Sequence, residues 1–248
     1  MRVLILFERS GIVREEFRNR GHDAWSCDAS PSEDGSPYHV QMVVSFESLL
    51  DIGVQVNEQI AETVFYHGLN VSTYTPWDLV IAHPDCTHLS VSGAHRFAAK
   101  RADGRQAKAI HAFKRVTEIK TKRLCVENPV CIMSTLWRKP DQIIQPYQFG
   151  DDASKKTCIW LEGLPKLIID PAQYVPPRYV CIGCGNHSKF GIQMAGCRNC
   201  GSHTSRPRWA NQTDSGQNRL GPSDHRAMDR ARTYPGHARA FAAQWGCL

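Results

Sequence analysis

The segment from Trp77 to Gly93, WDLVIAHPDCTHLSVSG, constrains the fold more than any other stretch of this chain. Its four apolar residues from Leu79 to Ala82 end before a His-Pro pair, which predicts a short buried strand. Cys86 follows two residues after the proline, in a loop rich in Ser, Thr and Gly. Loops that leave the carboxyl edge of a parallel sheet carry ligand-facing groups. Cys86 is therefore a candidate nucleophile, although a cysteine more often only fills a core.

Predicted strands and helices alternate along the chain. Strands are expected at residues 2–7, 24–27, 79–82 and 123–126, and residues 40–46 also fit a strand. Helices are expected at residues 11–20 and at 107–119, where apolar residues recur at helical spacing beneath a basic outer face. This alternation predicts an α/β fold with a mostly parallel sheet. Residues 46–76 support no functional assignment.

The first 28 residues have the outline of a nucleoside-binding half. A strand leads through a turn at Gly11 into a helix, and a second strand ends at Asp28, whose carboxylate could hold ribose hydroxyls. A single glycine falls short of the full Gly-rich fingerprint, and an Asp after a strand is more often a turn residue.

Length and composition indicate a globular protein with one sizeable core and a small appendage. The chain has 248 residues, of which 42% are hydrophobic. Its apolar runs are shorter than the ~18 residues of a membrane span, so we expect no membrane association and a cytoplasmic location. In a reducing compartment, the ten cysteines suit core positions, metal ligands or a nucleophile better than disulfides.

Positive charge is concentrated in two regions. From Arg178 to the end there are ten Lys and Arg against three Asp, and the segment from Arg96 to Arg123 holds another ten against Asp103 and Glu118. Such blocks favour a polyanionic partner, because neutralised phosphates release counterions. A solvated helix face is the plainer alternative for a single charge run. Two separate basic regions make nucleic acid the better interpretation.

Two CxxC pairs predict a metal site. Twelve residues separate them, and each pair is followed by glycine, at Gly185 and Gly201. Four thiolates at this spacing suit one structural zinc ion in a tetrahedral site, with His187 and His203 as bystanders. The predicted ligands are Cys181, Cys184, Cys197 and Cys200.

A second reactive group follows another predicted parallel strand. Glu127 directly follows the predicted strand at 123–126. The carboxyl ends of parallel strands converge on one cleft, so Glu127 and Cys86 can face the same cleft. HPDCT with SVSG, and ENPV further along, resemble the two signature segments of DNA cytosine-5 methyltransferases. LFERSG with Asp28, ASKKTCIWL and RTYPGHARAFAAQWG are similar to further segments of that family in the same order. The compact members carried by bacteriophages resemble this chain most.

This resemblance implies a fold and a domain order. The fold would be the Rossmann-like S-adenosylmethionine-dependent methyltransferase fold with an inserted zinc ribbon. Residues 1–177 would form the catalytic core, 178–222 the zinc ribbon with a basic DNA-recognition segment, and 223–248 a helix that returns to the core.

The resemblance also implies site residues. Cys86 would be the nucleophile, Glu127 the acid at the ring nitrogen, and Asn128 the residue that orders the cysteine loop. Lys156 falls where the family contacts the base. The two arginines of the family's QxRxR segment are replaced in this chain by Lys156 and Cys158. Asp85 stands where the family has proline. Phe7, Ser10, Gly11, Asp28 and Pro84 would line the cofactor. DNA would be contacted by Ser90, Arg96, Arg206 and Arg208.

The implied activity is transfer of a methyl group from S-adenosylmethionine to carbon 5 of a flipped cytosine, through a covalent cysteine adduct. Double-stranded DNA would be the partner, in the bacterial host cytoplasm or nucleoid, with no obligate protein partner. One alternative is a non-catalytic zinc-ribbon DNA-binding protein that keeps the fold. Another is an enzyme acting on RNA or on a free nucleotide, and the basic ribbon argues against the free nucleotide.

Overall fold

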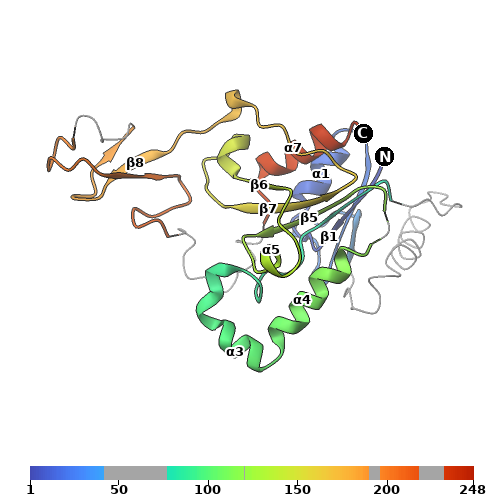
Figure 1. Ribbon diagram of the computed structural model, residues 1–248. Coiled ribbons are helices and arrows are strands. Elements are labelled where there is room, and N and C mark those ends of the chain that lie inside the picture. Colours follow the sequence, from blue (N-terminus) through green and yellow to red (C-terminus); the bar gives the residue numbers. More distant parts are fainter. Residues whose placement is uncertain (42–76, 120, 190–195, 218–231) are drawn as a thin grey trace, which may run out of the picture. The chain divides into compact units, whose positions relative to one another are not determined.

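The computed structural model describes residues 1–41, 77–119, 121–189, 196–217 and 232–248 (Figure 1). Its contacts divide the chain into two compact units. The first comprises Met1–Ile144, Lys156–Ile168 and Ala238–Leu248, and the second comprises Gln145–Lys155 and Ile169–His237.

In the described residues, a seven-stranded sheet forms the centre of the first unit, in the order β3-β2-β1-β4-β5-β7-β6. Its strands are parallel except β7, which runs antiparallel to both β5 and β6. This confirms the predicted α/β architecture with a mostly parallel sheet. Without β7 the order is that of a doubly wound nucleotide-binding sheet. The strands are β1 (Arg2–Leu6), β2 (Asp23–Asp28), β3 (His39–Gln41), β4 (Leu79–Ala82), β5 (Leu124–Pro129), β6 (Gln142–Ile144) and β7 (Thr157–Glu162).

Helices cover both faces of the sheet. Figure 1 shows α1 and α7 on one side and α4 on the other. Leu4 and Leu6 of β1 belong to one buried cluster with Phe113 of α4, whereas the alternate residues Val3 and Ile5 are buried on the opposite face. The described helices are α1 (Ile12–Arg18), η1 (Val91–Arg96), α3 (Phe97–Ala102), α4 (Arg105–Val116), α5 (Met133–Leu136), η2 (Pro146–Phe149), η3 (Pro171–Gln173) and α7 (Pro235–Trp245).

The elements predicted from sequence are present, with shifts at their ends. Strands expected at 2–7, 24–27, 79–82 and 123–126 correspond to β1, β2, β4 and β5, and the two helices correspond to α1 and α4. The possible strand at 40–46 is found as β3, His39–Gln41. Its later residues, and all of 46–76, lie outside the described residues.

The second unit contains a three-stranded antiparallel sheet in the order β10-β8-β9. Its strands are β8 (Arg178–Cys181), β9 (His187–Ser188) and β10 (Ser205–Arg208). Residues 145–155 belong to this unit, and within it Tyr147 stacks on Trp209, with ring centroids 4.3 Å apart. The indole of Trp209 also donates a hydrogen bond to the carbonyl of Val175 at 3.0 Å.

None of the described helices has the length and apolar character that crossing a bilayer requires.

Candidate functional site

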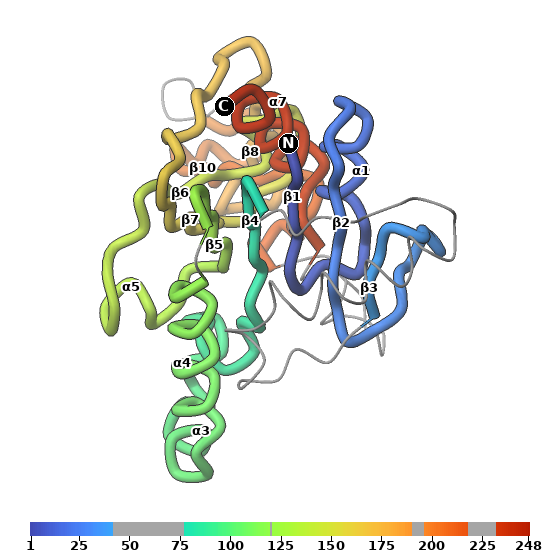
Figure 2. Tube along the Cα trace, turned by 90° about the vertical axis from the view of Figure 1, so that its right-hand side faces the viewer, coloured from blue at the N-terminus to red at the C-terminus, as the bar shows by residue number. Residues whose placement is uncertain are grey.

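Polar side chains follow β1, β4 and β5 at the carboxyl edge of the sheet. These three strands are neighbours and lie side by side in Figure 2. Ala82 pairs with Val126, so the next residues, His83 and Glu127, lie beside each other. The strand order reverses between β1 and β4, and open α/β sheets bind their ligands in the crevice at such a switch point.

Two buried hydrogen bonds join the loop after β4 to the end of β5. His83 Nδ1 lies 2.9 Å from Glu127 Oε2, and each side chain is only 8% exposed. Asn128, which is 1% exposed, donates from Nδ2 to the carbonyl of Pro84 at 2.7 Å. The structure therefore brings the HPDCT and ENPV segments together. His83 was not singled out from the sequence, because a histidine after a strand is no signal until its partner is known.

Cys86 occupies a tight turn directly after this junction. Its carbonyl accepts the N–H groups of Leu89 at 3.0 Å and Ser90 at 2.9 Å. Asp85 Oδ1 accepts the N–H of Thr87 at 2.9 Å, so this carboxylate helps to build the turn. That contact is a structural reason for the acidic residue where the resemblance leads one to expect proline.

A buried lysine supports the cysteine loop from α3. Lys100 is 6% exposed, and its Nζ donates to the carbonyl of Thr87 at 2.6 Å. Sequence reasoning placed Lys100 only within a basic cluster. The contact ties the loop that carries Cys86 to α3.

Cys86 is half-buried, whereas the other cysteines of the sheet are buried. Burial raises the pKa of the Cys27 thiol to about 12 and that of Cys131 to about 11. It also raises the pKa values of Cys125 and Cys158. Buried thiols of this kind are inert. Among the described cysteines at this edge of the sheet, Cys86 is thus the best placed to react.

The turn after β1 combines strain with a buried carboxyl group. Phe7 has a φ of 61°, and it is the only non-glycine among the described residues with positive φ. Glu8 is 4% exposed and accepts the N–H groups of Val13 at 2.7 Å and Arg14 at 3.2 Å. Burial raises the pKa of Glu8, against the opposing charge of His83. Glu8 therefore caps the N-terminus of α1 from within the chain.

The backbone conformation and the close packing at position 11 require glycine. Gly11 has a φ of 73°, and a Cβ atom there would clash with Arg14 Nη2 and lie 2.7 Å from Asp34 Oδ2. Arg14 is fully buried and ion-paired with Asp34. This turn is consequently packed against residues of the chain itself, and Ser10 makes a weak 3.4 Å hydrogen bond to Glu8.

The residues at the switch point fit S-adenosylmethionine in part. Asp28 ends β2, beside β1, and its Oδ1 accepts the N–H of Ser30 at 2.8 Å. Its position at the carboxyl edge suits a ribose hydroxyl. The N-terminus of α1 commonly receives an anionic group in such folds, but Glu8 already caps it. The carboxylate of a cofactor would need donors elsewhere.

Lys156 and the DNA-contact candidates of the first unit also lie at defined places. Lys156 is exposed and precedes Thr157, which pairs with Pro129 at the carboxyl end of β5. Ser90 forms an isolated bridge with Cys131, and its Oγ lies 2.9 Å from that of Ser92. Arg96 is exposed at the end of η1.

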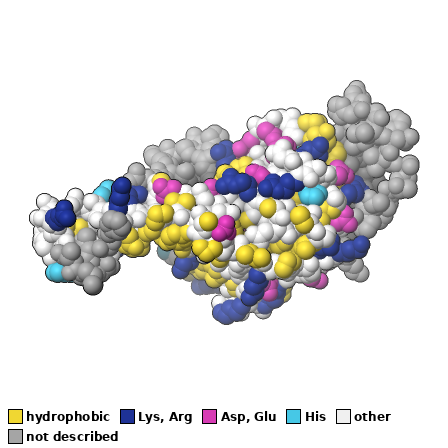
Figure 3. Space-filling view, turned by 90° about the horizontal axis from the view of Figure 1, so that it is seen from above, with side chains coloured by type: hydrophobic (Ala, Val, Ile, Leu, Met, Phe, Trp, Pro, Cys, Tyr) yellow, Lys and Arg dark blue, Asp and Glu magenta, His cyan; other side chains and the backbone are white. Residues whose placement is uncertain are grey.

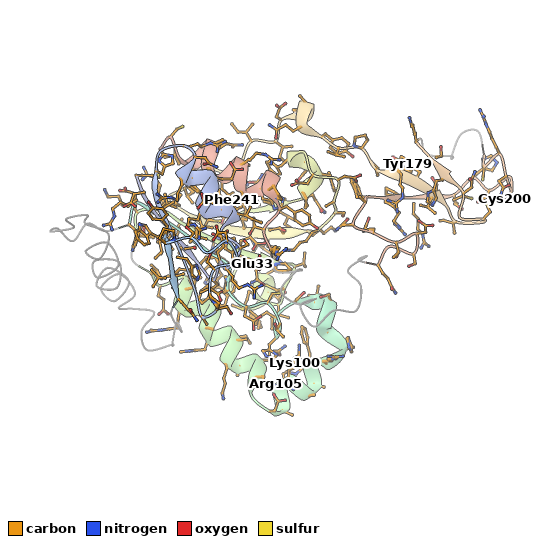
Figure 4. All side chains as sticks on the ribbon, turned by 180° about the vertical axis from the view of Figure 1, so that it is seen from behind. Glu33, Lys100, Arg105, Tyr179, Cys200 and Phe241 are labelled. Carbon is orange, nitrogen blue, oxygen red and sulfur yellow. The ribbon has the colours of Figure 1, made fainter. Side chains whose placement is uncertain are left out.

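Helices α3 and α4 extend beyond the sheet as a basic arm (Figures 1 and 2). Figure 4 places Lys100 and Arg105 on this arm. Its exposed basic side chains are Arg96, Arg101, Arg105, Lys108 and Lys114.

A hollow of about 480 Å³ lies at the other edge of the sheet. It is lined by Trp77 before β4, Lys122 before β5 and Glu162 at the end of the antiparallel strand β7, among other residues. It does not include the reactive groups described above, so we do not place the reaction there.

The four predicted metal ligands gather at one point of the second unit. The sulfur atoms of Cys181 and Cys200 lie 3.6 Å apart, as do those of Cys184 and Cys197, and all four lie within 4.8 Å of one another. A tetrahedral zinc ion with Zn–S bonds of ~2.3 Å places its sulfurs ~3.8 Å apart. The cluster therefore fits such an ion.

Local backbone and hydrogen bonds support this metal centre. Gly185 and Gly201 have φ values of 73° and 71°, and their N–H groups close turns onto Cys181 and Cys197. Hydrogen bonds from the Asn199 side chain and the Asn186 backbone lower the pKa of Cys184 to about 6, which favours the thiolate that binds metals. His187 Nε2 instead lies 3.0 Å from Asp214 Oδ2.

The two arginines beside Pro207 differ in exposure. Arg206 is exposed, whereas Arg208 is 9% exposed and donates from Nε to the carbonyl of Asp214 at 3.0 Å. The part of Figure 3 that shows the ribbon has Lys and Arg side chains at its surface. Arg206 is thus better placed than Arg208 to contact phosphate.

Comparison with known proteins finds structural likeness among solved structures. No protein-family model matches the chain, and no curated protein shows significant similarity to it. Among solved structures, it is similar to a prophage-encoded protein from E. coli that is provisionally described as a DNA modification methyltransferase. The sequence identity is 14% and the TM-score 0.42, over 69% of this chain and 49% of that one. The chain thus spans about half the length of that structure, and the function is argued from the site itself.

Proposed function

We propose that this protein is an S-adenosylmethionine-dependent DNA cytosine-5 methyltransferase. The observation that carries the proposal is the junction of the two loops. There, His83 is hydrogen-bonded to Glu127, and Asn128 donates a hydrogen bond to the carbonyl of Pro84. It sets Glu127 beside the loop that presents a half-buried Cys86. A thiol and a carboxyl group at one sheet edge are the pair that this chemistry needs.

The roles of the two groups follow from the reactivity of cytosine. Carbon 5 is a poor nucleophile until a thiolate adds to carbon 6, which is the role of Cys86. Glu127 protonates ring nitrogen 3 and so withdraws the charge that develops on the ring. S-Adenosylmethionine supplies the methyl group when it is bound. A base then removes the proton at carbon 5, and nitrogen 3 returns its proton to Glu127. The bond between Cys86 sulfur and carbon 6 breaks, which restores the ring double bond and frees the thiolate.

Binding roles are assigned to groups at the same edge and on the ribbon. Asp28 would hold the ribose of the cofactor, with Phe7 and Pro84 beside it. Lys156 would contact the base, which must leave the duplex stack to reach Cys86. Ser90, Arg96 and Arg206 would contact the nucleic acid, and the basic arm supplies further charge. The four-cysteine cluster would hold one structural zinc ion.

Nucleoside mass spectrometry tests this proposal. DNA from cells that express the protein should contain 5-methylcytosine above the level of cells that express Cys86→Ala. A methylated cytosine found only in RNA would reassign the substrate. Equal levels in the two cultures would contradict the proposal.

A non-catalytic DNA-binding protein is the second candidate, because Glu8 occupies the N-terminus of α1 where a cofactor anion is commonly received. Calorimetric titration with S-adenosylmethionine separates the two candidates. Binding that is lost in Asp28→Ala supports the enzyme, and absence of binding in the presence of DNA supports the second candidate.

A further inference from the structure

His83 has no role in the reaction outlined above, yet it is built into the site. Its side chain and that of Glu127 are each 8% exposed. Nδ1 lies 2.9 Å from Glu127 Oε2, while Nε2 is buried and makes no hydrogen bond within the described part of the chain. Burying a polar atom without a partner costs free energy. A histidine that only filled space at this position would therefore lower the stability of the folded protein.

The contact distinguishes between the two oxygens of Glu127. Oε2 faces His83, so the same contact fixes the direction in which Oε1 points. His83 is held by the end of β4 and Glu127 by β5, and these strands are paired through Ala82 and Val126. The orientation of the carboxyl group is consequently set by the sheet.

We propose that His83 is a positioning residue for the methyl-transfer reaction, and this inference rests on the proposed function. Its Nδ1–H group donates to Oε2 of Glu127 and turns Oε1 toward ring nitrogen 3 of the cytosine. As Cys86 adds to carbon 6, the Oε1–H bond breaks and the proton bonds to nitrogen 3. The negative charge left on Glu127 is stabilised by the N–H group of His83, which remains bonded to Oε2.

A double-mutant cycle on adduct formation tests this role. Single-turnover rates are measured with duplex DNA that contains 5-fluorocytosine, in the presence of S-adenosylmethionine. His83→Ala should slow the reaction about 10- to 100-fold, the range found when the hydrogen-bond partner that orients a metal ligand is removed. In the Glu127→Gln background the same change should cost less than about twofold, because the group that it orients is already lost. An equal loss in both backgrounds would show a merely structural role and overturn the inference.

Two amide variants keep the test decisive if His83→Ala does not fold. In His83→Asn the amide nitrogen lies near the position of Nδ1, so this variant should keep most of the rate. In His83→Gln the amide nitrogen lies near the position of Nε2, so this variant should not keep the rate. Equal rates for the two variants would overturn the inference.

His88→Ala is a matched control on the same loop. Nδ1 of His88 is likewise buried without a hydrogen bond in the described part of the chain, but His88 does not share the contact of His83 with Glu127, so this variant should retain the wild-type rate. Thermal unfolding and DNA affinity are recorded for every variant. If the wild-type protein forms no adduct, the proposed function fails and this inference falls with it. If it does and His83→Ala reacts at the wild-type rate, this inference alone fails.

Discussion

Gly11 illustrates how one residue sets the turn beside the candidate cofactor site. Its positive φ and the close approach of Arg14 exclude a side chain. Gly11→Ala should lower the free energy of unfolding by more than the ~1–2 kcal/mol that a left-handed conformation costs an alanine. Gly21 has a φ of 79°, and a Cβ atom there would meet no other atom within 4 Å, so Gly21→Ala should cost only the conformational part. Urea denaturation of both variants measures the difference, and equal losses would contradict this account.

At the residue scale, the sequence predicts candidate reactive groups but not the contacts that hold them. Cys86, Glu127 and Asn128 follow predicted strands and carry a recognisable motif. His83 and Lys100 act through contacts with residues remote in sequence, Glu127 and Thr87. Such contacts depend on strand register and on how α3 packs, which local pattern does not specify.

At the scale of elements, strands and helices with strong apolar patterns were predictable, and so was the cysteine cluster of the second unit, whereas the inclusion of residues 145–155 in that unit was not. β1, β2, β4, β5, α1 and α4 follow from alternation of apolar segments. Residues 145–155 contact the second unit through residues far apart in the chain, as where Tyr147 stacks on Trp209 and the Ser154 N–H donates to the side chain of Asn211. The cysteine cluster was predictable because its spacing alone encodes the turns that bring the sulfurs together.

The ribbon should bind one zinc ion per chain. Metal binding and folding of such small modules are coupled, so Cys181→Ser should lose the zinc and unfold the ribbon while the seven-stranded sheet keeps its structure. Cys247→Ser is the control, because Cys247 is an exposed cysteine outside the cluster. Elemental analysis gives the stoichiometry. Purified wild-type protein without zinc would refute this prediction.

Alanine variants of Arg206 and Arg208, which both lie in β10, should differ in their effects: the first should alter DNA binding and the second mainly stability. Arg206→Ala removes an exposed charge and should weaken DNA binding, reducing the slope of log K against log salt by about 1. Arg208→Ala removes a buried hydrogen bond to the carbonyl of Asp214 and should mainly lower stability. Binding isotherms at several salt concentrations give the slope. An unchanged slope for Arg206→Ala would move the phosphate contacts to the basic arm.

At the scale of the whole molecule, the sheet supplies the reactive edge and the second unit supplies a candidate metal centre with exposed arginine. The strand order puts the ends of β1, β4 and β5 side by side. This explains how His83 and Glu127, which are 44 residues apart in the sequence, come to share a hydrogen bond. The reaction proposed at this edge depends on Cys86 above all.

Trapping of the cysteine adduct tests that central claim most directly. Fluorine at carbon 5 of the cytosine blocks the final proton loss, so duplex DNA containing 5-fluorocytosine should remain bonded to the protein when S-adenosylmethionine is present. Peptide mapping by mass spectrometry should place the bond on Cys86, and Glu127→Gln should slow its formation about 10²- to 10⁴-fold. A protein that binds both DNA and cofactor but forms no adduct, or forms one on another residue, would contradict the account.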